Sequence, residues 1–336
     1  MATSRQVAKP PFAKRLMGNL LALFIGLMIA LLIGEIASRL IMPIFPGSLK
    51  LDKNGDPLEI HSVEPGAVYR QYSEEFDALT TITRDGYRVP EVQGDPDIVF
   101  IGDSFTFGQG LQDDDTFIMQ YCNQARLKCM NLGVPGMGTI TEVERLQKYL
   151  TDYKIHPKKV YLSMLVMTSF LGAGNDLNDN LQTMAQREDD HGDVHEEEPQ
   201  SGLRQLADTA FKYSNLARVL KFYFMPAIKN MIVIEPEKDR LQEALKLTQE
   251  QLAKLDALSK QYHFDYKIIL FHPVQDISRG SYKETIRQIQ AIAPIPVVSS
   301  AEILQPDPNQ YYFSLDGHFN KQGSQKIVEL LKSIEK

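Results

Sequence analysis

The strongest constraint on how this chain folds is an uncharged apolar run near its N-terminus. Residues 16–34 contain no charged side chain, and apolar residues continue past Glu35 and Arg39 to Phe45. A helix rises about 1.5 Å per residue, so about 20 apolar residues cross the hydrocarbon core of a bilayer. The sequence therefore predicts a transmembrane helix over residues 16–41.

The charges in front of this run predict its orientation. Residues 1–15 contain Arg5, Lys9, Lys14 and Arg15 and no acidic residue. Because positive charge tends to remain in the cytoplasm, we expect residues 1–15 inside and the folded domain on the far side of the membrane. In a Gram-negative cell this is a single-pass inner-membrane protein with a periplasmic domain.

A cleaved signal peptide is the alternative interpretation of the same run. Its apolar region usually has about 7–15 residues and ends at a small-x-small cleavage site. The run here is longer, and no clear site of that kind closes it. A retained anchor is therefore the preferred hypothesis.

Small residues form a regular ridge within the predicted anchor. They recur at every fourth position, at Gly18, Ala22, Gly26, Ala30 and Gly34. This spacing places them on one face of the helix, where a second helix can approach closely. Glycine and alanine are common in membrane helices, but five in register indicate helix pairing.

Composition restricts the function of the remaining chain. With 43% apolar and 24% charged residues it is typical of a folded globular protein. The net charge of −7 argues against nucleic-acid binding, which needs a concentrated basic surface. The two cysteines, Cys122 and Cys129, have no Cys or His close by to complete a zinc site. They are either buried thiols or, in an oxidising compartment, a disulfide.

The chain after the anchor divides into a lead-in and a larger domain. Residues 46–96 are rich in Pro, Gly and charge, with one β-like stretch near 78–82, and are expected to be a linker and lead-in. From residue 97 to 336, short apolar runs alternate with amphipathic segments. We expect strands at 98–101, 129–132, 160–165, 266–271 and 295–298, and helices at 117–125, 141–150, 237–262, 282–292 and 321–333. This alternation predicts a parallel sheet covered on both faces, with ligands at the carboxyl ends of its strands.

An insertion interrupts the alternation at about residues 182–236. Its first part, residues 187–201, is rich in acidic residues and histidine. Nothing apolar would hold these side chains in place, so a solvated loop is favoured over a metal site. The second part, residues 206–234, has apolar residues at helical spacing and is a candidate cap over the site.

Two segments far apart in the chain carry residues suited to nucleophilic catalysis. Ser104 follows the first expected strand; a serine on a strand-to-helix turn exposes its hydroxyl, although serine is equally common as a helix cap. Asp316 and His318 precede the last helix, and a histidine oriented by a carboxylate is the base that such a serine needs. His272, at another strand end, is the rival base.

Two further segments supply candidate donors for an oxyanion. Gly136 lies in the loop after the second expected strand and offers a backbone N–H with no side chain in the way. Asn175, in Gly174-Asn175-Asp176 after the third expected strand, carries an amide. Together with the Ser104 N–H they make three candidate donors.

These four segments, in this order, resemble the blocks of the SGNH, or GDSL, hydrolase superfamily. The resemblance covers about residue 97 to the C-terminus and implies a three-layer α/β/α sandwich with a central parallel sheet. It implies that Ser104 is the nucleophile, His318 the base, and Asp316 the residue that orients His318. It further implies an oxyanion hole formed by Ser104, Gly136 and Asn175, and no metal or organic cofactor.

The sequence departs from the commoner family pattern in two places. Only Gly317 separates Asp316 from His318, where two residues are usual; this variant resembles relatives involved in acylating exported polysaccharides. Asn175 also follows its strand after a longer stretch than usual.

The resemblance implies an extracytoplasmic serine esterase that cleaves ester-linked acyl groups from a small molecule, lipid or polysaccharide. One alternative is an O-acetyltransferase or deacetylase acting on cell-envelope polysaccharide, since pocket shape and water exclusion choose the acceptor. The other is a non-catalytic, membrane-tethered assembly protein with the same fold. Retention of every functional position argues against the latter, because a scaffold has no physical need for a charge pair beside a nucleophile.

Overall fold

A computed structural model describes residues 12–41, 49–51, 63–168, 175–191, 213–217, 219–220, 237–305 and 307–335. The chain forms two compact units, one of residues 1–46 and 197–233 and the other of residues 47–196 and 234–336. Gly174, residues 192–201 and most of the candidate cap at 206–234 lie outside the described residues.

The predicted apolar helix is confirmed in the first unit as α1 (Phe12–Ile41). Residues Met17–Ile41 have a mean hydropathy of 2.6 and are long and apolar enough to cross a membrane. Large apolar side chains are exposed along this helix, for example Leu23 at 71% and Phe24 at 60%. Such exposure suits a lipid environment. The orientation of α1 stays a prediction.

The end of α1 carries a polar contact with a segment of the insertion. The Glu35 carboxylate accepts hydrogen bonds from the backbone N–H groups of Asn215 (2.9 Å) and Leu216 (3.0 Å). Leu216 also packs on Gly34, since a Cβ at Gly34 would lie 3.0 Å from its Cδ2. This member of the small-residue ridge thus contacts the chain's own insertion, and helix pairing stays a prediction.

The second unit is built on a five-stranded sheet with the order β5-β4-β6-β7-β8, all parallel. Its strands are β4 (Ile98–Gly102), β5 (Cys129–Asn131), β6 (Lys159–Leu165), β7 (Asp265–Phe271) and β8 (Val297–Ser299). Each predicted strand is present within one or two residues. β8 begins only after Pro296, which has no N–H to donate to a neighbouring strand.

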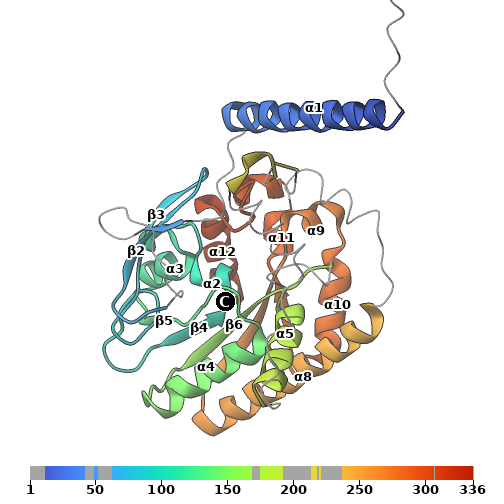
Figure 1. Cartoon of the computed structure of the whole chain (residues 1–336). Coiled ribbons are helices and arrows are strands. Elements are labelled where there is room, and N and C mark those ends of the chain that lie inside the picture. Colours follow the sequence, from blue (N-terminus) through green and yellow to red (C-terminus); the bar gives the residue numbers. More distant parts are fainter. Residues whose placement is uncertain are drawn as a thin grey trace, which may run out of the picture. The chain divides into compact units, whose positions relative to one another are not determined.

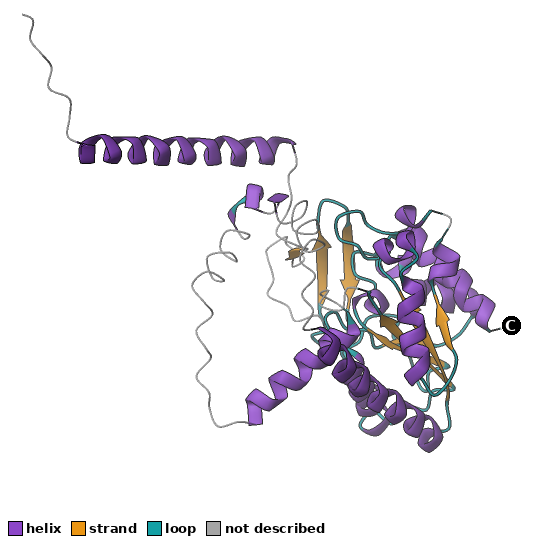
Figure 2. Cartoon of the chain, turned by 90° about the vertical axis from the view of Figure 1, so that its right-hand side faces the viewer, coloured by secondary structure: helices purple, strands orange, loops and turns teal. Residues whose placement is uncertain are grey.

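Side chains alternate between the two faces of this sheet, and each face is covered by helices (Figures 1 and 2). Val99 and Ile101 point into one core, while Ile98 and Phe100 point into the other. The first core is closed by α4 (Thr139–Thr151), α5 (Asp176–His191) and α8 (Glu237–Tyr262). The second is closed by α3 (Phe117–Ala125), α9 (Val274–Arg279), α11 (Ala301–Leu304) and α12 (Lys321–Ile334). α10 (Tyr282–Ile292) contributes to both cores. The predicted three-layer α/β/α sandwich is confirmed.

The start of the insertion is more ordered than the sequence indicated. α5 continues to His191, so the acidic stretch expected as a loop from residue 187 begins inside a helix. Arg187 pairs with Glu144 of α4, with nitrogen–oxygen distances of 3.0 and 2.6 Å. This ion pair fixes the helix against its neighbour, a contact that local composition cannot reveal.

Residues 63–96, expected as a lead-in, pack as part of the second unit. β2 (Val68–Tyr72) and β3 (Asp77–Thr81) form an antiparallel hairpin that β1 (Leu49–Leu51) extends to three strands. The buried face of the hairpin is partly polar, because the Gln71 amide donates to the Thr80 hydroxyl at 2.6 Å. A polar inward face conceals the strand pattern from a search for apolar alternation.

A buried arginine ties this lead-in to the segment that follows Ser104. The Arg88 side chain is fully buried and pairs with Asp113 at 2.9 Å. Its guanidinium also donates to the carbonyls of Phe107 (2.9 Å), Gly108 (2.6 Å) and Leu111 (2.6 Å). The turn at 107–111 is therefore held by a residue from the lead-in.

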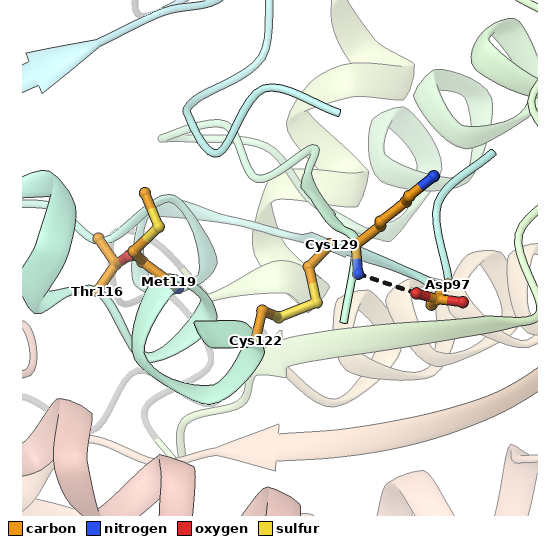
Figure 3. Close-up of a disulfide and its surroundings, with 6 residues drawn as sticks. Asp97, Thr116, Met119, Cys122 and Cys129 are labelled. Atoms are coloured by element: carbon orange, nitrogen blue, oxygen red, sulfur yellow. Dashed lines mark hydrogen bonds between the residues drawn. A yellow bond between two sulfur atoms is a disulfide. The ribbon is translucent and has the colours of Figure 1, made fainter. Parts of the chain in front are cut away.

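The two cysteines form a disulfide, which decides between the two alternatives left open by the sequence. Cys122 belongs to α3 and Cys129 is the first residue of β5, with Cα atoms 6.1 Å apart (Figure 3). The N–H of Lys128, the residue before Cys129, donates to the Asp97 carboxylate at 2.9 Å. The bond therefore links a covering helix to the edge strand of the sheet.

Candidate active site

The turn after β4 presents Ser104 at the carboxyl end of the strand. A Cβ at Gly102 would lie 2.1 Å from the Thr106 hydroxyl oxygen and 2.7 Å from the Ser163 carbonyl oxygen, so only glycine fits there. Asp103 caps the short helix α2 (Ser104–Phe107) by accepting a hydrogen bond from the Phe105 N–H at 2.9 Å. Ser104 is thus not the helix cap, and its hydroxyl is available for another contact.

The loop before α12 brings a histidine and a carboxylate to this serine. The Ser104 Oγ lies 2.6 Å from His318 Nε2, and His318 Nδ1 lies 2.5 Å from Asp316 Oδ1. The loop is closed by the Phe313 N–H, which donates to the His318 carbonyl at 2.8 Å. Gly317 takes φ of +85°, a conformation that favours glycine. Three residues predicted from two separate segments therefore form one hydrogen-bonded chain.

The surroundings of Asp316 keep its carboxylate ionised. Burial by itself would raise the pKa of Asp316, but the hydrogen bond and the charge of His318 outweigh it, and the pKa falls below its ordinary value. The ionised Asp316 therefore accepts a hydrogen bond from the His318 Nδ1–H, which leaves Nε2 to face Ser104. The Phe105 ring packs on the His318 ring with centroids 4.6 Å apart and limits its rotation.

The loops with the candidate oxyanion donors follow the two strands that flank β4. The loop after β5 lies against α2, because a Cβ at Gly133 would be 2.4 Å from the Phe107 nitrogen. Further along this loop, Gly136 is exposed with φ of +75°. Asn175 is buried immediately before α5, beyond β6. Gly136 and Asn175 thus belong to the same sheet edge as Ser104, and their part in an oxyanion hole stays a prediction.

The rival base His272 is directed elsewhere. Its Nε2 lies 3.0 Å from the Ser299 hydroxyl, and its Nδ1 lies 3.4 Å from the Thr285 hydroxyl. Burial lowers the pKa of His272 to about 4, so it is neutral at physiological pH. His272 is a satisfied core residue of the second unit.

A cluster of buried carboxyl groups, which sequence reasoning missed as a group, lies in the same region. Asp103, Glu142, Asp176 and Asp179 are each at most 8% exposed. At least one carboxyl oxygen of each has no hydrogen-bond partner among the described residues. Burial raises the pKa of Asp103 to about 7, against the opposing charge of His318, and raises that of Asp179 to about 6. Burial raises the pKa of Glu142 and of Asp176 as well, so each carboxyl group of the cluster binds its proton more tightly than it would in water.

The sequence contains a weak signal for this cluster. Glu142 lies four residues before Leu146, on the face of α4 that the structure buries. An acidic residue on an apolar helix face is rarely placed there without a reason. Among the described residues, no group of three or more His, Cys, Asp or Glu side chains could hold a metal ion.

The sequence matches no family model, and no curated protein matches it. The solved structures that resemble the chain include the following three. A candidate lipolytic protein of the G-D-S-L family from Desulfitobacterium hafniense DCB-2 is 14% identical, with 70% of this chain and 98% of that chain covered and a TM-score of 0.39. LAE5, an alpha/beta hydrolase enzyme from the metagenome of Lake Arreo, Spain, is 12% identical over 72% and 95%, with a TM-score of 0.38. The acetyl xylan esterase AlAXEase is 14% identical over 70% and 98%, with a TM-score of 0.34.

The architecture of the second unit is described from its own elements. It has a parallel sheet between two helical layers. Ser104 follows β4, and Asp316 and His318 precede the last helix, α12. This is the three-layer α/β/α sandwich with a central parallel sheet that the sequence predicts.

Proposed function

We propose that this protein is a membrane-anchored serine hydrolase that cleaves ester-linked acyl groups outside the cytoplasm. The observation that carries the proposal is the continuous hydrogen-bonded chain from Ser104 through His318 to Asp316, with distances of 2.6 and 2.5 Å. A serine hydroxyl becomes nucleophilic when a positioned base accepts its proton, and this chain meets that requirement.

The reaction proceeds by acyl transfer through Ser104. His318 Nε2 takes the proton as Ser104 Oγ attacks the ester carbonyl, and the same proton passes to the leaving alcohol when the tetrahedral intermediate collapses. Asp316 holds the His318 ring and stabilises the imidazolium. The backbone N–H groups of Ser104 and Gly136 and the Asn175 amide stabilise the oxyanion. Water, activated by His318, then releases the acyl group and restores the serine.

Two features support an extracytoplasmic location. The helix Met17–Ile41 is long and apolar enough to serve as an anchor. The Cys122–Cys129 disulfide lies in the second unit, and disulfides form and persist mainly in oxidising compartments such as the periplasm. Both fit an enzyme tethered to the membrane with its site on the far side from the basic N-terminus.

The proposal is tested with the full-length protein in detergent micelles and p-nitrophenyl esters of increasing acyl length. We expect Ser104→Ala and Asp316→Asn each to lower kcat by about 10⁴-fold, because each removes one member of the chain. Ser314→Ala is the matched control, since Ser314 is an exposed serine of the same loop. Wild-type hydrolysis by the Ser104→Ala variant would refute the role of Ser104.

The same assay separates the alternative functions. Transfer of the acyl group to an added sugar hydroxyl, faster than hydrolysis, would identify an O-acetyltransferase, and release of acetate from acetylated polysaccharide would identify a deacetylase. A fluorophosphonate probe should label the wild-type protein and Ser314→Ala but not Ser104→Ala. Failure to label the folded wild-type protein would favour the non-catalytic assembly protein.

A further inference from the structure

The turn of the lead-in hairpin is fixed by local hydrogen bonds. Ser73 closes the turn between β2 and β3, because its N–H donates to the Phe76 carbonyl at 2.9 Å. The Ser73 hydroxyl also accepts hydrogen bonds from the N–H groups of Glu75 (3.1 Å) and Phe76 (3.3 Å). The backbone of Glu75 is therefore held in one conformation, and its side chain leaves the turn in a defined direction.

The Glu75 carboxylate contacts the loop that carries Asp316 and His318. Its Oε2 accepts two hydrogen bonds, from the backbone N–H groups of Leu315 and Asp316, both at 2.8 Å. The partners are about 240 residues apart in the chain. Hydrogen bonds to an ionised carboxylate are roughly twice as strong as those between neutral groups. Glu75 thus hydrogen-bonds directly to the backbone of Asp316.

Neighbouring contacts join the hairpin, the loop and the nucleophile turn. The rings of Phe76 and Phe313 pack with centroids 5.0 Å apart. Both rings lie over Gly110, where a Cβ would come within 2.8 Å of each. The Gly110 N–H donates to the Gln71 side chain of the hairpin at 3.1 Å. The hairpin therefore contacts both halves of the site, and the Glu75 side chain hydrogen-bonds to the loop.

The loop has no replacement for these two hydrogen bonds. Its own backbone bonds run from Phe313 to the His318 carbonyl and from Gly317 to the Phe313 carbonyl. In the described part of the chain, the N–H groups of Leu315 and Asp316 donate to Glu75 and to no other residue. Without Glu75 the backbone at Leu315 and Asp316 would lose both of these hydrogen bonds, and a displacement of about 1 Å in a catalytic group can lower a rate about 100-fold.

We propose that Glu75 is a positioning residue that holds the Asp316–His318 pair against Ser104. The inference rests on the proposed function, because it concerns the same three residues. It assigns the hairpin of residues 68–81 to the working site, so the functional domain begins before residue 97. Glu75 acts through the loop backbone and does not touch the reacting atoms.

The test compares three variants of the full-length protein in detergent micelles. Glu75→Ala removes both acceptor bonds, while Glu75→Gln keeps an acceptor oxygen without the charge. Asp77→Asn is the matched control, since Asp77 lies in the same hairpin and its carboxylate pairs with Arg70. The readouts are kcat and KM for a p-nitrophenyl ester and the far-downfield proton resonance of the His318 Nδ1–H, which reports the bond to Asp316 directly.

We expect Glu75→Ala to lower kcat about 10- to 100-fold with KM changed less than about twofold, and to shift or broaden the resonance. Glu75→Gln should retain at least about a third of the wild-type kcat, and Asp77→Asn should match the wild type. Glu75→Ala with wild-type kcat and an unchanged resonance would overturn the proposal. So would an equal loss of kcat in Asp77→Asn, which would indicate a general effect of the hairpin.

Two further arms keep the test decisive. If Glu75→Ala does not fold, Glu75→Asp takes its place: the carboxylate then retreats by one methylene group, kcat should fall between the wild-type and inactive values, and wild-type kcat would overturn the proposal. Failure of the proposed function would appear differently, as absence of Ser104-dependent hydrolysis in the wild type. The resonance would still report in that case whether Glu75 holds the loop.

Discussion

Removing the buried charge of Asp179 should make this protein more stable, and the gain should depend on pH. Asp179 lies on α5, is 8% exposed, and has a carboxyl oxygen without a hydrogen-bond partner among the described residues. Burial raises its pKa from 3.8 to about 6. Asp179→Asn replaces the carboxyl group with a neutral amide of nearly the same shape.

The sign follows from the two pKa values. The unfolded chain releases the Asp179 proton near pH 4, whereas the folded chain keeps it until about pH 6. Stability from this group is therefore fully present below about pH 4 and is lost as the pH rises through 6. A pKa raised from 3.8 to about 6 corresponds to about 3 kcal/mol at pH 8. Because Asp103 and Glu142 share the same region, we expect Asp179→Asn to gain about 1–3 kcal/mol at pH 8 and almost nothing at pH 4.

The assay is urea unfolding of the full-length protein in detergent micelles, followed by far-UV circular dichroism at pH 4 and pH 8. Asp307→Asn is the control, because Asp307 is exposed and this substitution removes the same formal charge. Its stability should follow the wild type at both pH values. The reasoning fails if Asp179→Asn is no more stable than the wild type at pH 8, or if its gain is the same at pH 4.

Two further predictions concern contacts that tie distant segments together. Arg88→Met should lower the free energy of unfolding by about 3–5 kcal/mol, because Asp113 and three backbone carbonyls lose a fully buried partner; an unchanged urea midpoint would contradict this. The double variant Cys122→Ala/Cys129→Ala should have a free energy of unfolding about 2 kcal/mol lower, because its unfolded chain is no longer restricted by the disulfide. A reducing agent should then lower the midpoint of the wild type and leave that of the double variant unchanged.

The sequence carried most of the information about the sheet and about the chain from Ser104 to Asp316. Strands of a parallel sheet are buried on both faces, so their apolar runs are visible without any knowledge of partners. The catalytic candidates follow strands or precede a helix, and such boundaries are marked by local residues such as Gly102 and Gly317. The apolar helix Met17–Ile41 was visible for the same reason, since apolar length is a local property.

Other features depended on the tertiary structure because they join residues that the sequence keeps far apart. The hairpin of residues 68–81 buries a polar face, so its strands lack the apolar alternation that would identify them. Glu75 is one acidic residue among many until the fold places its carboxylate beneath the backbone of Asp316. The sequence alone could not exclude His272 as the base, and only the structure shows that it is buried against the Ser299 and Thr285 hydroxyls.

The division between the two sources of information has a single physical cause. Periodicity, helix caps and strand ends arise from the chain's interaction with its own neighbours in sequence, and these were readable in advance. Whether Cys122 meets Cys129, or whether Asp179 keeps its proton, depends on distance and burial, which packing alone sets. The sequence therefore determined the sheet and the candidate catalytic residues, and the tertiary structure decided what holds those residues in place.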